Sequence, residues 1–244
     1  MMPENNLTSL TPRRINLLWL IGFAILTIVL WNVPGGKTIL YPFTLLGTWF
    51  HEMSHGVAAM ILGGNFHRLE LFADGSGLAY FSGRLFLGNI GHALVAMAGP
   101  LGPTIAGSVL IILSVKRKAV SPALIIFSFI LGISALIWIR SIVGLAVALG
   151  FALILMYAAI KGSDRAKMLT AQFLGIQAWM SVYLSFDYLF SSGASVGGGS
   201  YKSDTAVIAE YLLLPHWFWG GLIILISLFL LYQSLRFAYF KRKS

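Results

Sequence analysis

The stretch WFHEMSHGVAAM, residues 49–60, places two histidines and a glutamate inside an otherwise apolar run. The pattern is H-E-x-x-H, with Glu52 directly after His51 and His55 four residues after it. On a helix, residues four apart lie on one face, one turn above the other. Both imidazoles can therefore bind one metal ion, with Glu52 beside that face. The stretch predicts a membrane helix that carries a metal site.

The chemistry of this pattern is hydrolysis assisted by zinc. Two histidines hold the ion, the ion lowers the pKa of a water molecule, and Glu52 takes the proton as the water attacks a carbonyl. The chain has no cysteine, so a metal must be held by His, Asp or Glu. A simpler alternative is that His51 and His55 bond across helices while Glu52 stays neutral in a cavity.

The composition around this stretch is that of a membrane protein. The 244 residues are 58% hydrophobic and only 10% charged, and the mean hydropathy is +0.84. We expect an all-α polytopic fold of about six or seven transmembrane helices, forming a single domain over residues 1–244. Its core is expected at 40–115 and 168–215, with polar tails at 1–14 and 240–244. The apolar runs predict helices at 15–33, 40–63, 86–115, 119–139, 141–161, 168–191 and 216–239, and a short amphipathic helix within 203–215.

The net charge of +9 belongs to short basic clusters between the apolar runs. Such clusters are typical of cytoplasmic loops and membrane surfaces, so nucleic acid is not expected as a partner and the lipid bilayer is. The apolar run after the first cluster has no clear cleavage site and predicts a retained signal anchor. Three candidate spans lie between the first two clusters, an odd number that cannot place both clusters on the same side of the membrane. Either the N-terminus faces outward despite its arginines, or one element within 34–115 does not cross; our hypothesis is the second. The clusters are Arg13–Arg14, Lys116–Lys118, Lys161/Arg165/Lys167 and Lys241–Lys243.

A β-hairpin is predicted over residues 66–83, where apolar and polar residues alternate around a turn at Asp74-Gly75. An edge strand facing the metal could accept an extended peptide as an additional strand. The residues expected to bind substrate on this edge are Leu69, Leu71, Gly75 and Gly77. The alternative is that the hairpin only shields the site from water. The glycine-rich run 193–200 predicts a loop.

Three segments together resemble the site-2 protease family of intramembrane zinc metalloproteases, in particular its compact bacterial and plant relatives without a PDZ domain. They are the helix HEMSHGVAAMILGG, the hairpin RLELFADGSGLAY and the Gly-Pro segment AMAGPLGPTIAG at 96–107. The resemblance implies a multi-pass protein of a bacterial inner membrane or a plant or organelle membrane. It also implies Zn²⁺ as cofactor, and as substrate a transmembrane segment of another membrane protein.

The third zinc ligand is open, because the family takes it from a Leu-Asp-Gly motif that this chain lacks. Pro103 and Thr104 also stand where the family often has an asparagine. Asp187 is the first candidate, since a carboxylate inside an apolar run needs a partner such as a metal. Asp204 is the alternative third ligand, although it could simply cap the short helix after it.

Two functions other than proteolysis fit a protein of this kind. One is a catalytically silent membrane chaperone or regulator of the same fold, which would have no need of Glu52. The other is a transporter, which commonly shows paired repeats of broken helices. No internal repeat is visible in the sequence, so a metalloendopeptidase is the function that the sequence favours.

Overall fold

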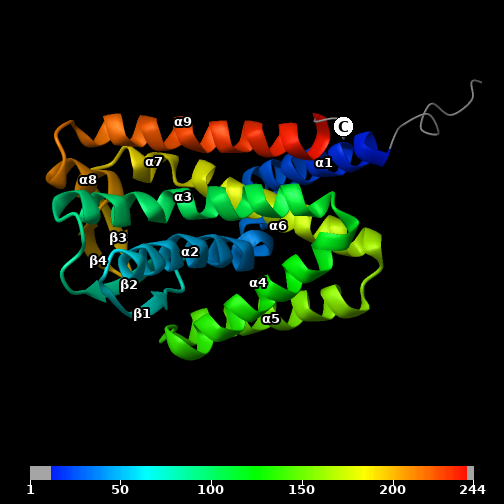
Figure 1. Cartoon of the computed structure of the whole chain (residues 1–244), viewed down its shortest axis with the longest axis horizontal. Coiled ribbons are helices and arrows are strands. Elements are labelled where there is room, and N and C mark those ends of the chain that lie inside the picture. Colours follow the sequence, from blue (N-terminus) through cyan, green and yellow to red (C-terminus); the bar gives the residue numbers. More distant parts are fainter. Residues whose placement is uncertain (1–11, 241–244) are drawn as a thin grey trace, which may run out of the picture.

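The computed structural model describes residues 12–240, which form a helical bundle with two small antiparallel hairpins at one end (Figure 1). The predicted helical fold with a β-hairpin after the HExxH helix is confirmed, whereas most of the two polar tails lies outside the described residues. In chain order the elements are α1 (Pro12–Asn32), α2 (Gly36–Ile61), β1 (Asn65–Leu71), β2 (Gly77–Ser82), α3 (Asn89–Ser114), α4 (Arg117–Ile137), α5 (Ile142–Lys161), α6 (Asp164–Leu184), α7 (Phe186–Leu189), β3 (Gly193–Val196), β4 (Gly199–Lys202), α8 (Asp204–Tyr211), α9 (His216–Leu235) and the π-helical turn η1 (Arg236–Phe240).

Within residues 12–240, four helices are long and apolar enough to cross a membrane: α3, α4, α5, and α9 together with η1. Helices α1 and α2 pass the same test only as a pair, bent by 118° at a short break, which makes up to five spans if the pair counts as one. The expected six or seven spans are therefore not confirmed. The break contains Pro34 and Gly35, and the glycine has a φ of +77°, a conformation that other residues adopt only with strain.

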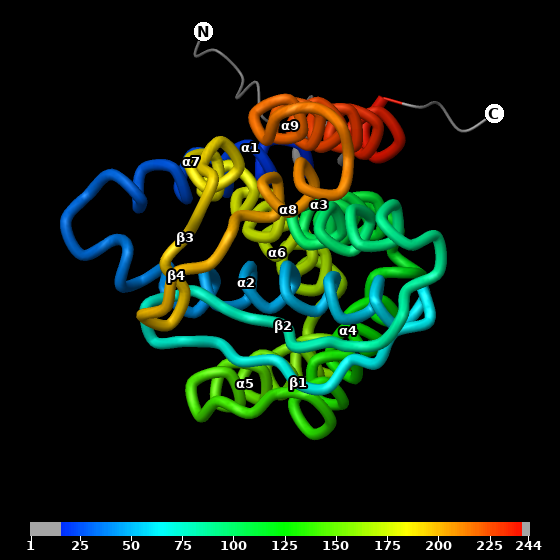
Figure 2. The backbone as a smooth tube through the Cα atoms, turned by 90° about the vertical axis from the view of Figure 1, so that its left-hand side faces the viewer, coloured from blue at the N-terminus to red at the C-terminus, as the bar shows by residue number. Residues whose placement is uncertain are grey.

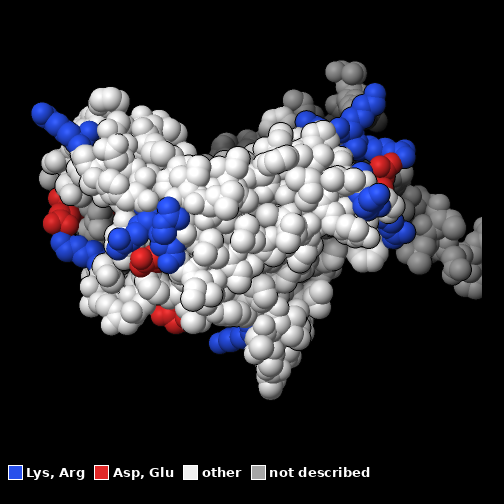
Figure 3. All heavy atoms as spheres, turned by 90° about the horizontal axis from the view of Figure 1, so that it is seen from below, with Lys and Arg blue, Asp and Glu red and all other residues white. Residues whose placement is uncertain are grey.

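Most of the charged side chains visible in Figure 3 gather toward the two ends of the bundle, and the wide band between them is uncharged except for one basic side chain near its lower edge. At one end, Arg117 at the start of α4 forms an ion pair with Asp164 at the start of α6. At the opposite end lie the two hairpins and α8 (Figure 1). This separation of charge is the pattern expected of a bundle whose long helices cross a lipid bilayer.

Helix α2 lies in the middle of the bundle, with α3 and α6 on one side and α4, α5 and the first hairpin on the other (Figure 2). Small residues allow the close approach of its neighbours. A Cβ atom on Gly102 of α3 would lie 2.5 Å from the Cβ of Ser54 on α2, and one on Gly107 would lie 2.7 Å from the carbonyl oxygen of Gly175 on α6. The glycines of the Gly-Pro segment thus allow α3 to pack closely against both α2 and α6.

The first hairpin pairs β1 with β2, and the outer edge of β1 is already occupied. The N–H of Leu69 donates to the carbonyl of Trp138 at 2.8 Å, and the N–H of Arg140 donates to the carbonyl of Leu69 at 3.0 Å. The main-chain N–H and C=O of Leu69 therefore point away from β2. Leu69 and its cross-strand partner Ala79 form a non-hydrogen-bonded pair, so the N–H and C=O of Ala79 point away from β1. The free edge of the hairpin belongs to β2.

The glycine-rich run 193–200 forms most of a second hairpin, β3–β4, rather than a loop alone. Its tip rests on the turn of the first hairpin. There the N–H of Gly197 donates to Ser76 Oγ at 3.1 Å, and Gly197 packs against the ring of Phe72 so closely that a Cβ atom would lie 2.8 Å from it. The two hairpins thus meet at one end of the bundle, beside α2.

Candidate metal centre and its cavity

His51 and His55 lie one turn apart on α2, as the spacing predicts, with their ring centroids 4.8 Å apart. Gly99 of α3 packs directly against both rings. A Cβ atom at this position would lie 2.2 Å from His55 Nε2 and 2.8 Å from His51 Nε2. Because only a residue without a side chain fits there, Gly99 leaves space open at the two nitrogen atoms that face the site.

The ring of His55 is fixed by a hydrogen bond to α3. Its Nδ1 lies 2.7 Å from the main-chain carbonyl oxygen of Val95, in a buried position. A carbonyl oxygen only accepts, so Nδ1 carries a proton and Nε2 is the nitrogen that is turned toward Asp204. This orientation leaves Nε2 as the atom that could bind a metal, and the carbonyl is the kind of outer partner that orients such ligands.

Asp204 brings its carboxylate to the same two nitrogen atoms from the first turn of α8. Oδ2 lies 2.9 Å from His51 Nε2, and Oδ1 lies 3.2 Å from His55 Nε2. The carboxylate is free to do so because Ser203 caps the helix, accepting the N–H of Ala206 on its hydroxyl. The three residues form a group whose candidate ligand atoms all lie within 4.8 Å of one another.

The electrostatics favour an ionised Asp204. Burial raises the pKa of this carboxyl group, but the charges of His55 and His51 outweigh burial and hold the pKa below its ordinary value of 3.8. Oδ2 is buried and accepts no hydrogen bond from any described residue, although it lies so close to His51. Both atoms are of the kinds that bind zinc in proteins.

Asp187, the first candidate from the sequence, is not a member of this group. The helix expected over 168–191 ends at Leu184, and Asp187 lies exposed in the short α7 that follows. The premise that its carboxylate lies inside a membrane-spanning helix is therefore wrong. The structure brings Asp204 and not Asp187 to the two histidines.

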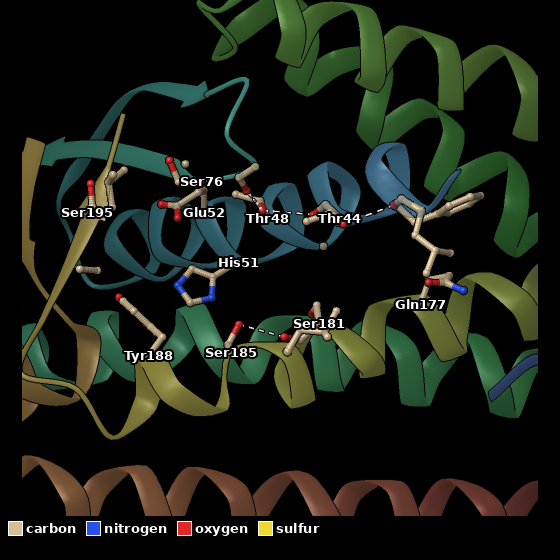
Figure 4. A pocket seen from close by; sticks show the side chains of 18 of the residues that line it. Thr44, Thr48, His51, Glu52, Ser76, Gln177, Ser181, Ser185, Tyr188 and Ser195 are labelled. Carbon is tan, nitrogen blue, oxygen red and sulfur yellow. Dashed lines mark hydrogen bonds between the residues drawn. The ribbon is translucent and has the colours of Figure 1, made fainter. Parts of the chain in front are cut away.

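Glu52 borders a cavity of about 350 Å³ that opens next to His51 (Figure 4). Glu52 is 7% exposed, and its carboxylate faces the main chain of Ala79 on β2. The rest of the wall combines small polar side chains of α2 and α6 with the two hairpins. The polar wall residues beside His51 and Glu52 are Thr44, Thr48, Ser76, Gln177, Ser181, Ser185, Tyr188 and Ser195.

Of the four hairpin residues expected to bind substrate, two reach this cavity and two do not. Gly75 and Gly77 line it. Leu69 and Leu71 are buried in the core, and the edge of their strand is taken by the segment that joins α4 to α5. The sequence alternation located the hairpin correctly but could not tell which of its two edges is free.

Gly99, Ala79 and Tyr188 also border the site, and the sequence analysis assigned none of them to it. The sequence does contain a feature that points to Gly99, since this residue belongs to the Gly-Pro segment that follows the hairpin. No sequence feature points to Ala79 or Tyr188, because their positions depend on the pairing of β2 and on the turn between α6 and α7.

Comparison with known proteins gives one match. A family model described as Peptidase M50B-like matches residues 19–234. The searches of curated proteins and of solved structures each gave no match. The matched range contains α2, the first hairpin, α3 and α8, and therefore every residue of the candidate metal centre.

Proposed function

The chain belongs to the Peptidase M50B-like family, in agreement with its resemblance to the site-2 proteases, and from this we propose that it is an intramembrane zinc metalloprotease. The observation that carries the proposal is the convergence of His51, His55 and Asp204 beside Glu52 and the cavity. The substrate would be a transmembrane segment of another membrane protein. The protein would act as a multi-pass component of its membrane, in accord with its four or five candidate spans.

The residues present fit a zinc ion. Two imidazole nitrogen atoms and one carboxylate are a common ligand set for catalytic zinc, which leaves a further coordination position open. The space that Gly99 leaves and the buried Asp204 Oδ2 without a hydrogen bond are the observations expected of such a site. Zinc bound there would act as a Lewis acid on the peptide carbonyl and on the attacking water.

Glu52 is the proposed general base. It lies one residue from His51, at the edge of the cavity where a water molecule and a peptide bond have room. Its carboxylate would take the proton of the water as the water attacks, and would then pass it to the leaving amine.

The free edge of β2 is the proposed binding site for the unwound substrate. A transmembrane helix satisfies its own backbone hydrogen bonds, so a segment that unwinds for cleavage needs replacement partners. Gly77 and Ala79 direct their main-chain groups away from β1 and toward α2, next to Glu52. An extended peptide added to this edge would run past the candidate metal centre.

The test is cleavage of a reporter membrane protein by the purified chain in liposomes, together with its zinc content. We expect the wild type to contain one zinc ion per chain and to cleave. Glu52→Gln should keep the zinc and lose about 10²–10⁴-fold of the cleavage rate. Glu210→Gln is the matched control, because Glu210 lies on the exposed side of α8 in an ion pair with Lys202.

Equal cleavage by the wild type and Glu52→Gln, with zinc in both, would refute Glu52 as the base. Zinc in the wild type without any cleavage would favour the silent membrane chaperone or regulator instead. A wild type that binds no zinc, while His51→Ala and Asp204→Ala leave its behaviour unchanged, would refute the metal site itself.

A further inference from the structure

Tyr188 lies between the candidate ligands and has no role in the proposed hydrolysis. It belongs to the four-residue helix α7. Ser185 ends α6 and directly precedes α7. The side chain is partly buried and points from α7 toward the cavity that holds His51 and Glu52 (Figure 4). Its two functional parts, the hydroxyl and the ring, each contact a different candidate ligand.

The hydroxyl contacts Asp204. The main-chain N–H of Asp204 donates to the Tyr188 hydroxyl at 3.0 Å. This N–H belongs to the first turn of α8 and has no carbonyl partner within its own helix. The cap residue Ser203 accepts the N–H of Ala206 instead, so among the described residues Tyr188 is the acceptor of the Asp204 N–H.

The ring contacts His51. The two ring centroids lie 6.2 Å apart at an interplanar angle of 72°, an edge-to-face arrangement. His55 is oriented by its hydrogen bond to Val95, whereas Nδ1 of His51 has no such bond to any described residue. Packing must therefore orient the ring of His51, and Tyr188 supplies part of it.

We infer that Tyr188 is a positioning residue that holds Asp204, through its hydroxyl, and His51, through its ring, in the arrangement that binds the metal. This rests on the proposed zinc site. Outer residues that hold a metal ligand in place typically contribute 10- to 100-fold to metal affinity, and the Tyr188 hydroxyl would act on Asp204 through its main-chain N–H. The neighbouring backbone does not depend on Tyr188, because Ser203 Oγ and Thr205 Oγ1 bond the carbonyls of Ser191 and Leu189.

The experiment measures zinc affinity by competition with a chromogenic chelator for the purified full chain in detergent. Tyr188→Phe removes the hydroxyl and keeps the ring, so we expect zinc to bind about 10- to 100-fold more weakly. Excess zinc should restore its cleavage rate to within about twofold of the wild type. Tyr188→Leu also removes the ring and should bind zinc more weakly still. Tyr183→Phe is the matched control, since this tyrosine of α6 is 61% exposed.

A second arm asks whether the hydroxyl acts through Asp204. In an Asp204→Ala background, Tyr188→Phe should change zinc affinity by less than about twofold, because non-additivity marks residues that act together. An equal effect with and without Asp204 would overturn the inference. A zinc affinity of Tyr188→Phe equal to that of the wild type would also overturn the inference. This holds whether the variant keeps or loses cleavage at saturating zinc. A wild type that binds no zinc would instead refute the proposed function, so the two failures are distinguishable.

Thermal unfolding of the zinc-free variants separates positioning from a general structural role. We expect zinc-free Tyr188→Phe to unfold within about 2 °C of zinc-free Tyr183→Phe, because the other hydrogen bonds of α8 remain. A lower unfolding temperature, together with an unchanged zinc affinity, would show that the hydroxyl stabilises the fold and not the metal site.

Discussion

Gly99→Ala is the sharpest perturbation of the candidate metal centre, because it adds one methyl group at the two histidines. The added Cβ atom would lie 2.2 Å from His55 Nε2, whereas real Cβ atoms essentially never approach closer than 3.0 Å. The ring or the helix must therefore move by at least about 0.8 Å, the difference between these two distances. His55 cannot easily yield, since it is buried and bonded to Val95.

A displacement of this size is large for a metal ligand. Zinc–ligand distances are held to about ±0.2 Å, so a shift about four times larger removes His55 from the ion or forces the ion from the site. We expect the zinc dissociation constant to rise by at least about 100-fold, or about 2.8 kcal/mol at 1.4 kcal/mol for each factor of ten. Cleavage of a reporter membrane protein should fall in parallel.

The assay is chelator competition and zinc analysis of the purified protein, with Gly132→Ala as the control. Gly132 lies in the helix α4 and has open space where its Cβ would be, so the same substitution meets no neighbour. Both changes favour the helix by up to about 1 kcal/mol, which separates the loss of zinc from a loss of folding. Zinc affinity of Gly99→Ala within threefold of the wild type would refute the assignment of the metal to this space.

Two further predictions concern the third ligand and the free strand edge. Asp204→Asn should weaken zinc binding by more than about 100-fold while Asp187→Asn leaves it unchanged, as measured by zinc content after dialysis; the reverse order would restore Asp187 as the ligand. Gly77→Ala should keep zinc but lower cleavage by about tenfold or more, because its Cβ would lie 2.6 Å from Thr48 Cγ2 and 2.9 Å from Glu52 Cγ. Unchanged cleavage by this variant, with the reporter protein as substrate, would argue against the role of the β2 edge.

The parts of the fold that the sequence predicts well are those determined by local periodicity. His51 and His55 share a face because a helix repeats every 3.6 residues, and this holds wherever the helix lies. The first hairpin follows from alternation and from the turn at Asp74, whose Oδ1 accepts the N–H of Ser76 at 2.9 Å. Neither feature needs knowledge of a distant contact.

The parts that the sequence predicts poorly depend on where a run of apolar residues is interrupted. The run 168–191 reads as one span, but its helix ends at Leu184. This break removes Asp187 from the interior and turns Tyr188 toward the site. The choice between the edges of β1 and β2 likewise depends on Trp138 and Arg140, which lie far along the chain from Leu69. Periodicity within a segment carries no information on such contacts.

The three candidate ligands are held in different ways, and this has a physical consequence. His51 and His55 project from α2, which is packed against α3 through glycines and needs no metal to keep its place. Asp204 instead follows a hairpin with a glycine-rich tip, and its first turn is bonded to the segment around α7 while Ile208 packs α8 against α3 and α9. Each such bond contributes about 1 kcal/mol net, whereas ordering each residue of the hairpin costs about 1–2 kcal/mol.

These hydrogen bonds contribute little beside the roughly 10–16 kcal/mol that structural zinc can supply in small proteins. If zinc binds as proposed, the ion contributes to the position of α8 as well as being bound by it, whereas α2 and α3 are fixed without it. The β3–β4 hairpin leads directly into Ser203 and Asp204 and also borders the cavity through Ser195. Access to the cavity and the integrity of the metal site therefore depend on the same short segment.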